Sequence, residues 1–287
     1  MEILSPETGQ KFIDATAGGG GHSLAILEKI YPNGQLLAID LDRVALERVE
    51  KRIVAINQNL KNNLILVQGN FADIDEIAKK NGLAKVDGIM ADLGFSSDQL
   101  EQSGRGFTFK INEPLDMRYN VSQSLTAREI INQWPQEKID EILKSYGEER
   151  FAGRIASEII KSRQVKSIIT TFELIAAVSR AVPKFYQHAR IHYATKTFQS
   201  LRIAVNDELG NLERFLASSF GLLNGGGRLV IISFHSLEDR IIKNFFRQLK
   251  QEKLAEILTK KPIGPSTEEI KINPRSRSAK LRAIEKQ

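Results

Sequence analysis

The first part of the chain alternates between short apolar runs and segments with helical periodicity. Apolar runs that predict strands lie at Lys11–Ala15, Gln35–Asp40, Leu64–Gln68 and Val86–Asp92. The segment after the second run has apolar residues at helical spacing: Val44, Leu46, Val49 and Ile53. A helix is also expected at His22–Tyr31. Short strands that alternate with helices predict an α/β fold with a parallel sheet covered on both faces.

The pattern changes between Leu100 and Ser200, where no run resembles a strand. Helices are expected there at Ala127–Trp134, Lys138–Tyr146, Arg150–Ser162 and Thr171–Val182. The pattern then predicts helices near Lys196–Leu223 and Leu237–Lys253, a strand at Gly227–Ser233, and two antiparallel edge strands near Leu254–Lys260 and Ala279–Ala283. Residues 1–100 and 201–287 therefore form one predicted domain, and residues 101–200 an inserted all-helical subdomain.

Composition narrows the chemistry of the chain. The 287 residues include no cysteine, which excludes a thiolate metal site and a cysteine nucleophile. No apolar run approaches the roughly 18 residues that span a bilayer, so a cytoplasmic location without a membrane partner is expected. Most of the net charge of +6 lies in Lys271–Gln287, which predicts contact with phosphates.

Residues suited to an adenosine-containing ligand follow all four predicted strands. In an open parallel sheet, ligands bind at the carboxyl ends of the strands. The first strand leads into Gly18–Gly21, where the backbone can approach a ligand closely. Asp40 ends the second strand, where an acid accepts hydrogen bonds from ribose hydroxyls. Phe71 follows the third strand and could pack on adenine, and Asp92 ends the fourth.

Two cofactors share this adenosine pattern. An NAD-linked oxidoreductase also uses glycines and an acid after the second strand, but its diphosphate is poorly matched to carboxylates at Asp14 and Asp92. Those carboxylates suit the cationic sulfonium and amino groups of S-adenosylmethionine. The residues therefore favour S-adenosylmethionine as the cofactor.

Several longer motifs resemble one family, the MraW-type methyltransferases of small-subunit ribosomal RNA. The motifs are DATAGGGGHS (14–23), AIDLD (38–42), DLGFSSDQL (92–100), RGFTF (105–109), PLDMR (114–118), YGEER (146–150), ATKTFQSLRIAVNDEL (194–209), GGRLVIISFHSLEDRIIK (226–243) and NPRSRSAKLR (273–282). The chain departs from the family pattern at Phe95, at Tyr193 and Lys196, and in lacking a His-x-Pro-Val-Leu segment before the first strand.

The resemblance implies a class I (Rossmann-like) methyltransferase sheet, with residues 101–200 as the substrate-recognition subdomain. It implies S-adenosylmethionine-dependent N4-methylation of a cytidine in the decoding region of 16S ribosomal RNA. Carried over by position, the cofactor contacts fall on Gly20, Gly21, His22, Asp40, Phe71, Asp92 and Gln99. The partner is then 16S ribosomal RNA or the small ribosomal subunit, and the oligomeric state stays open, with a homodimer among the alternatives.

Transfer to an amine agrees with the absence of cysteine, because an exocyclic amine attacks the methyl carbon directly. A hydrogen-bond acceptor would localise the N4 lone pair and align it. Asp92 is the first candidate acceptor, and Ser233 and His235 are candidates if Asp92 bonds the cofactor instead. Phe95 could stack on the flipped-out base or pack in the core.

The remaining candidates concern metal and RNA. His188 and His192 are spaced like a zinc pair, but no third ligand is apparent, so no catalytic metal is predicted. RNA contacts are expected from Arg105, Arg118, Arg275, Arg277, Lys280 and Arg282. Two other functions remain open: an amine methyltransferase for DNA or protein, and a non-catalytic ribosome-assembly factor.

Overall fold

The computed structural model describes residues 1–94 and 104–287. The chain divides into two compact units: Met1–Phe95 with Leu209–Gln287, and Ser96–Glu208. The predicted residues Phe95 and Gln99 lie outside the described ranges. Among the described residues, no helix combines the length and the apolar character that crossing a membrane requires.

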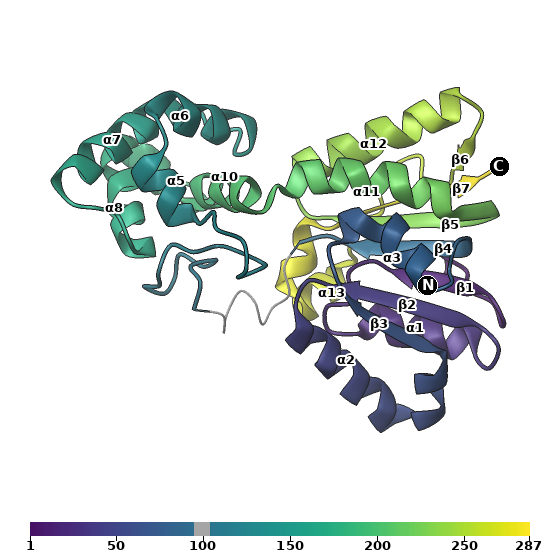
Figure 1. The fold of residues 1–287 in the computed structure, drawn as a ribbon. Coiled ribbons are helices and arrows are strands. Elements are labelled where there is room, and N and C mark those ends of the chain that lie inside the picture. Colours follow the sequence, from purple (N-terminus) through teal and green to yellow (C-terminus); the bar gives the residue numbers. More distant parts are fainter. Residues whose placement is uncertain (95–103) are drawn as a thin grey trace. The chain divides into compact units, whose positions relative to one another are not determined.

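The first unit is built on one seven-stranded sheet with the order β3-β2-β1-β4-β5-β7-β6 (Figure 1). Its strands are β1 (Lys11–Asp14), β2 (Gln35–Asp40), β3 (Leu64–Gln68), β4 (Val86–Asp92), β5 (Leu223–Ser233), β6 (Ala255–Ile257) and β7 (Lys280–Lys286). β1 to β5 pair in parallel, while β7 runs antiparallel to both β5 and β6. The predicted antiparallel edge is confirmed. The strand order and the antiparallel edge agree with the α/β fold expected from the sequence.

Alternate strand residues enter two separate cores, as the pleat of a strand requires. Phe12 and Leu36 pack with α1 (Gly21–Ile30) and α2 (Arg43–Ile56) on one face. Ile13 and Leu37 pack on the other face, together with residues of α3 (Ile74–Lys80), α11 (Glu208–Leu222) and α12 (Ser236–Gln251). Figure 1 shows α1 and α2 on one side of the strands and α11 and α12 on the other. Coverage of both faces explains why the central strands are almost wholly apolar.

The second unit has its own apolar core and consists of helices with connecting loops. Its helices in the described residues are α5 (Ala127–Gln133), α6 (Gln136–Ser145), α7 (Ala152–Val165), α8 (Thr171–Ala181), α9 (Lys184–Gln187) and α10 (Thr195–Asn206). Capping boxes fix the starts of α5 and α8: Thr126 pairs with Glu129, and Thr170 pairs with Glu173. In the described part of this unit, strand pairing is limited to a single bridge between Pro114 and Thr170.

The prediction of one helix near Lys196–Leu223 is wrong. Asp207 has φ 47° and interrupts the helix, so that α10 ends before it and α11 begins after it. The Asn206 side chain accepts from the Tyr119 N–H and donates to the Met117 carbonyl. These bonds hold the end of α10 to a loop of its own unit, and the chain then passes to the other unit.

Helical turns in the loops of the first unit were not predicted. They are the short helices η1 (Gln58–Asn63), η2 (Phe71–Asp73) and η3 (Pro274–Ser278), together with α13 (Thr267–Ile272). Each begins at a residue whose side chain accepts a backbone N–H: Asn57, Asn70, Asn273 and Ser266. Caps of this kind stabilise turns too short to show a periodic apolar pattern.

Candidate active site

The glycine loop joins β1 to α1 and leaves space along its backbone. Gly18 and Gly20 have φ of 49° and 75°, which glycine adopts without strain, and Gly20 is the residue before the first turn of α1. A Cβ on Gly20 would lie 3.1 Å from a Val49 methyl, whereas one on Gly19 or Gly21 would meet nothing within 4 Å. The loop is therefore packed at Gly20 and open at Gly19 and Gly21.

Asp40 ties the end of β2 to this loop. One carboxylate oxygen accepts the Gly18 N–H at 2.8 Å, and the other accepts the Asp42 N–H at 2.9 Å. Burial raises the pKa of Asp40 above its usual value, while the two N–H bonds oppose that rise. Each carboxylate oxygen can accept more than one hydrogen bond, so Asp40 can still accept from the hydroxyls of a ribose.

Asp92, at the end of β4, combines a fixed backbone with an unused acceptor. Its N–H donates to the Thr16 hydroxyl at 2.6 Å. Its Oδ2 lies 3.7 Å from His22 Nε2, and this carboxylate raises the pKa of His22. Its Oδ1 is buried and has no hydrogen-bond partner within residues 1–94 and 104–287. A buried carboxylate oxygen is costly to leave unpaired, so this atom marks a position for a donor.

The family model for the MraW methylase family matches residues 1–287. The chain belongs to that family. Three relatives named "Ribosomal RNA small subunit methyltransferase H" match nearly throughout. The relative from Heliobacterium modesticaldum is 42% identical over 100% of this chain and 95% of its own. The relative from Persephonella marina is 46% identical over 97% and 93%, and that from Geobacter sulfurreducens 44% over 100% and 96%.

Family membership identifies the protein as a methyltransferase with S-adenosylmethionine as its methyl donor. The residues at the strand ends fit this cofactor: Gly19 and Gly21 leave space for close approach, and Asp40 keeps acceptor capacity for ribose hydroxyls. In the methylase, Phe71 stands in η2, partly buried, and its ring meets Phe215 edge to face at 5.2 Å. It is positioned by Asn70, which caps η2 and donates to Asn211.

Asp14 has a different role from the one that its sequence position indicated. The sequence analysis placed its carboxylate opposite a cationic ligand. In the methylase it is 1% exposed, and it accepts from the Ser23 hydroxyl at 2.6 Å and from the Thr16 N–H. Burial raises its pKa. Asp14 therefore holds the glycine loop against α1, and its burial leaves no surface for a ligand.

Ser233 and His235, the alternative catalytic candidates, are held by their own secondary structure. Ser233 is fully buried, and its hydroxyl is 3.4 Å from the Lys280 carbonyl oxygen across the sheet. His235 caps α12, with Nδ1 accepting the Glu238 N–H and Nε2 3.2 Å from a Glu238 carboxylate oxygen. Ser236 is the first residue of α12, so the cap is His235. These contacts fix the orientation of both side chains.

Several arginines and lysines predicted to contact RNA bind the protein instead. Arg282 is buried and pairs with Asp239 at 2.6 Å, and Lys280 pairs with the same carboxylate at 3.1 Å. Arg105 donates to two backbone carbonyls. Arg118 pairs with Asp116 and donates to two further carbonyls. For Arg282 the predicted phosphate contact is corrected, since this guanidinium is buried and engaged by its own chain. The phosphate contacts of Lys280, Arg105 and Arg118 stay predictions. Arg277, by contrast, is exposed on η3.

The two histidines considered as a zinc pair lie in the helical unit. His192 stacks on Phe109, with centroids 4.6 Å apart, and on Tyr193 at 4.3 Å. Partial burial lowers the pKa of His192. This ring is therefore part of an aromatic stack.

The sequence analysis overlooked Thr16 and Ser23, which hold Asp92 and Asp14 in place. One signal was available. Asp14 and Thr16 are two residues apart, the spacing at which an aspartate side chain accepts a backbone N–H. The contacts from Thr16 to β4 and from Ser23 to β1 depend on the fold and leave no comparable mark in the sequence.

Proposed function

We propose that this methyltransferase modifies N4 of a cytidine in the decoding region of 16S ribosomal RNA. Its relatives carry names that specify ribosomal RNA of the small subunit, at 42–46% identity over nearly the whole chain. The motif resemblance implies the cytidine and the atom. The observation that carries the chemistry is Asp92 Oδ1, a buried acceptor without a partner in the described ranges, at the carboxyl end of β4.

The cofactor residues of the proposal are those at the ends of the first four strands. Gly20 and Gly21 shape the loop, Asp40 accepts from the ribose hydroxyls, and Phe71 packs on the adenine. His22 lies beside Asp92 and completes the set together with Gln99, which is outside the described residues. When bound, S-adenosylmethionine supplies an electrophilic methyl group.

Asp92 is the residue that we assign to the amine. An N4–H bond to Oδ1 withdraws the lone pair from conjugation and holds the nitrogen in one orientation. The backbone of Asp92 is fixed by Thr16, so the acceptor is positioned before the substrate arrives. On methylation N4 gains one carbon and loses one proton, and the carboxylate that accepts its hydrogen bond is the nearest base. The internal contacts of Ser233 and His235 make them weaker candidates.

The direct test is methyl transfer from labelled donor to small ribosomal subunits and to naked 16S ribosomal RNA, both lacking the modification. We expect label in N4-methylcytidine after digestion to nucleosides, at a single site in the decoding region. Label on DNA or protein only, or at another atom of the base, contradicts the proposal. No transfer to any of these substrates would instead support a non-catalytic assembly factor.

The role of Asp92 is tested separately with Asp92→Ala. We expect methyl transfer to fall at least 100-fold, the usual effect of losing a preorganised transition-state contact. Glu28→Ala, which removes an exposed carboxylate near the C-terminal end of α1, is the matched control. If methyl transfer falls while wild type and Asp92→Ala bind S-adenosylmethionine with the same affinity, Asp92 is assigned to the amine. A loss confined to donor binding assigns it to the cofactor, and full activity of the variant removes it from both roles.

We further propose a cytoplasmic location, because the ribosomal substrate is there, and a substrate-recognition role for the helical unit.

A further inference from the structure

An exposed group of arginines and aromatic rings lies where the start of α7 meets α9 in the helical unit. The Arg150 guanidinium lies 4.7 Å from the centroid of the Phe151 ring and 5.8 Å from that of Phe185. Arg154 lies 5.9 Å from the Phe151 ring, whose centroid is 6.4 Å from that of Phe185. Phe185 is 64% exposed. The exposed Phe185 ring thus lies next to the partly buried Phe151 ring and the Arg150 guanidinium, so the surface combines apolar area with positive charge.

The group is anchored from beneath by a buried contact. The Tyr186 hydroxyl donates to Glu149 at 2.9 Å, and the Tyr186 ring meets Phe151 edge to face at 5.0 Å. Burial and the neighbouring carboxylate raise the pKa of Tyr186 to about 12, so the hydroxyl stays protonated and keeps donating. Glu149 is 3% exposed and points inward, so its charge is not displayed beside the arginines.

The charge of this region is positive and largely unpaired. Between Glu173 and Asp207 the sequence has no acidic residue, but it contains Arg180, Lys184, Arg190, Lys196 and Arg202. Arg180 and Arg202 pair with Glu158 and Glu208. Arg150, Arg154, Lys184 and Arg190 are exposed, and none of them forms an ion pair with a described residue.

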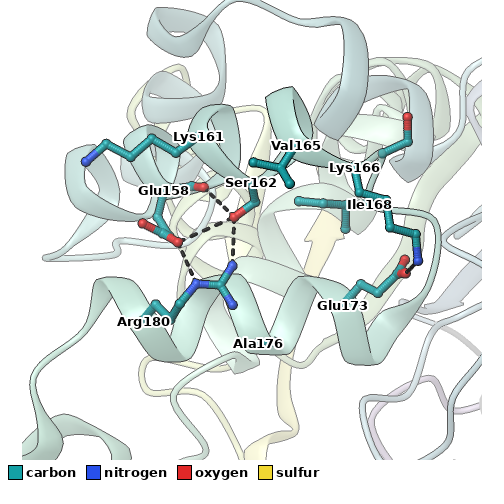
Figure 2. A pocket seen from close by; sticks show the side chains of 10 residues that line it. Glu158, Lys161, Ser162, Val165, Lys166, Ile168, Glu173, Ala176 and Arg180 are labelled. Carbon is teal, nitrogen blue, oxygen red and sulfur yellow. Dashed lines mark hydrogen bonds and ion pairs between the residues drawn. The ribbon is translucent and has the colours of Figure 1, made fainter.

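The cations continue into a hollow beside α7. A hollow of about 310 Å³ is lined by Gly153, Arg154, Ser157, Glu158, Lys161 and Ala181. Glu158 is neutralised by Arg180 at 2.6 Å, and Arg180 also donates to the Ser162 hydroxyl. Figure 2 shows this network, with Lys161 extending away from it. The hollow thus presents Arg154 and Lys161 as its uncompensated charges.

We propose that Arg150, Phe151, Arg154, Lys161, Lys184 and Phe185 form an RNA-binding surface that takes an unpaired stretch of the substrate. The lysines and arginines contact phosphates, and a base stacks on Phe185. An exposed ring favours single-stranded over double-stranded RNA, because only an unpaired base offers a free face. The inference rests on the proposed function for the identity of the RNA, and it deepens that function by naming the surface and the strandedness.

The test compares variants for binding to a fluorescein-labelled single-stranded RNA oligonucleotide and to a duplex of the same sequence. Fluorescence anisotropy is measured at several salt concentrations with full-length protein. Phe185→Ala is matched by Phe172→Ala, which removes a 47% exposed ring on α8. Arg154→Gln is matched by Lys138→Gln, which removes an exposed cation on α6. Donor binding and methyl transfer to small subunits are measured in parallel.

We expect Phe185→Ala to weaken single-strand binding by about 5- to 150-fold, the range for loss of one base–aromatic stack. Arg154→Gln is expected to reduce the slope of log K against log salt by about 0.7, the value for one phosphate of a single strand. In methyl transfer, KM should rise while donor affinity stays unchanged. The control variants should match wild type.

The inference is overturned if wild type does not bind the single strand, or if Phe185→Ala binds it as tightly as wild type does. It is also overturned if Phe185→Ala and Arg154→Gln weaken duplex binding by as much as they weaken single-strand binding. Failure of the proposed function has a different signature. Wild type would then transfer no methyl group to ribosomal RNA, whatever the anisotropy measurements show for the surface.

Discussion

Replacing Gly20 and Gly21 by alanine, one at a time, distinguishes two roles of the loop: the backbone conformation at Gly20 and the space for the cofactor at Gly21. Gly20 has φ 75°, a conformation that costs a residue with a Cβ about 1–2 kcal/mol. Its added Cβ would also press on two Val49 methyls at 3.1 and 3.3 Å. One kcal/mol shifts Tm by about 2–4 °C in a unit of this size. Gly20→Ala should therefore lower the Tm of the donor-free protein by roughly 2–8 °C.

Gly21→Ala should do the opposite. Gly21 is the first residue of α1, and a Cβ there meets nothing within 4 Å. Alanine is favoured over glycine in a helix by at most about 1 kcal/mol, so Tm without donor should stay level or rise by up to about 4 °C. If S-adenosylmethionine occupies this open side of the loop, the Cβ that Gly21→Ala adds takes part of the space that the cofactor needs. Overpacking of about 1–3 kcal/mol corresponds to a Kd raised about 5- to 150-fold.

The assay is thermal unfolding with and without S-adenosylhomocysteine, together with calorimetric Kd values. Gly221→Ala is the matched control, because Gly221 is also a helical glycine with open space around its Cβ, on α11. It should gain stability without any change in Kd. A wild-type Kd for Gly21→Ala would refute the placement of the donor along the open side of the loop. An unchanged Tm for Gly20→Ala would refute the strain assigned to that glycine.

Three further predictions concern other charged residues of the sheet unit. Asp40→Asn should raise the Kd for S-adenosylhomocysteine about 10- to 150-fold in calorimetry, because charged hydrogen bonds of about 1.5–3 kcal/mol are lost. The pKa of His22, measured by NMR titration, should lie above 6.5 and fall in Asp92→Asn. The stability that the His22–Asp92 pair contributes is fully present below pH 6.5 and is lost as the pH rises through the pKa of His22 in the folded protein. Arg282→Met should cost about 3–5 kcal/mol in urea unfolding, whereas Arg277→Ala should leave stability within about 0.5 kcal/mol and reduce the salt slope of RNA binding by about 0.7.

Each of these has a control. Asp42→Asn, which keeps a side-chain oxygen to cap α2, should leave both stability and Kd nearly unchanged, and equal Kd values for all three proteins contradict the role of Asp40. The titration midpoint of His192, which lies in the helical unit and whose pKa is lowered by burial, should be the same in wild type and Asp92→Asn. A His22 midpoint that Asp92→Asn does not move contradicts the pairing. An Arg282 variant that folds stably but loses RNA binding contradicts its assignment to the protein interior.

The sheet was predicted well because its signal is local. β2 and β4 begin and end where their apolar runs do, since burial on both faces requires an unbroken run. β3 also matches its apolar run, although it is an edge strand and only partly buried. β5 begins at Leu223, earlier than predicted, because Leu223 pairs with Val86 across a register shift next to Gly88. Such a pairing depends on a strand far away in the sequence and has no local pattern.

The basic residues were predicted less well for a related reason. A sequence shows where a cation is, but its availability depends on what the fold brings beside it. Arg282 looks like part of a basic tail, yet as a β7 residue it lies against Asp239 of α12. Phe185 and Arg150 were not singled out, because they are far apart in sequence and no motif joins them. Their proximity appears only once α7 and α9 are in place.

The three aspartates at the strand ends, Asp14, Asp40 and Asp92, differ in how many of their hydrogen-bond acceptors the protein itself uses. Asp14 is fully enclosed and bonds only to its own chain, so it supports the loop. Asp40 accepts one N–H on each oxygen and keeps acceptor capacity on both, which suits a diol. Asp92 leaves one buried oxygen without a partner in the described residues. Because an unpaired buried carboxylate oxygen is destabilising, we propose that this one is matched by a ligand that supplies the hydrogen. An exocyclic amine supplies such a hydrogen.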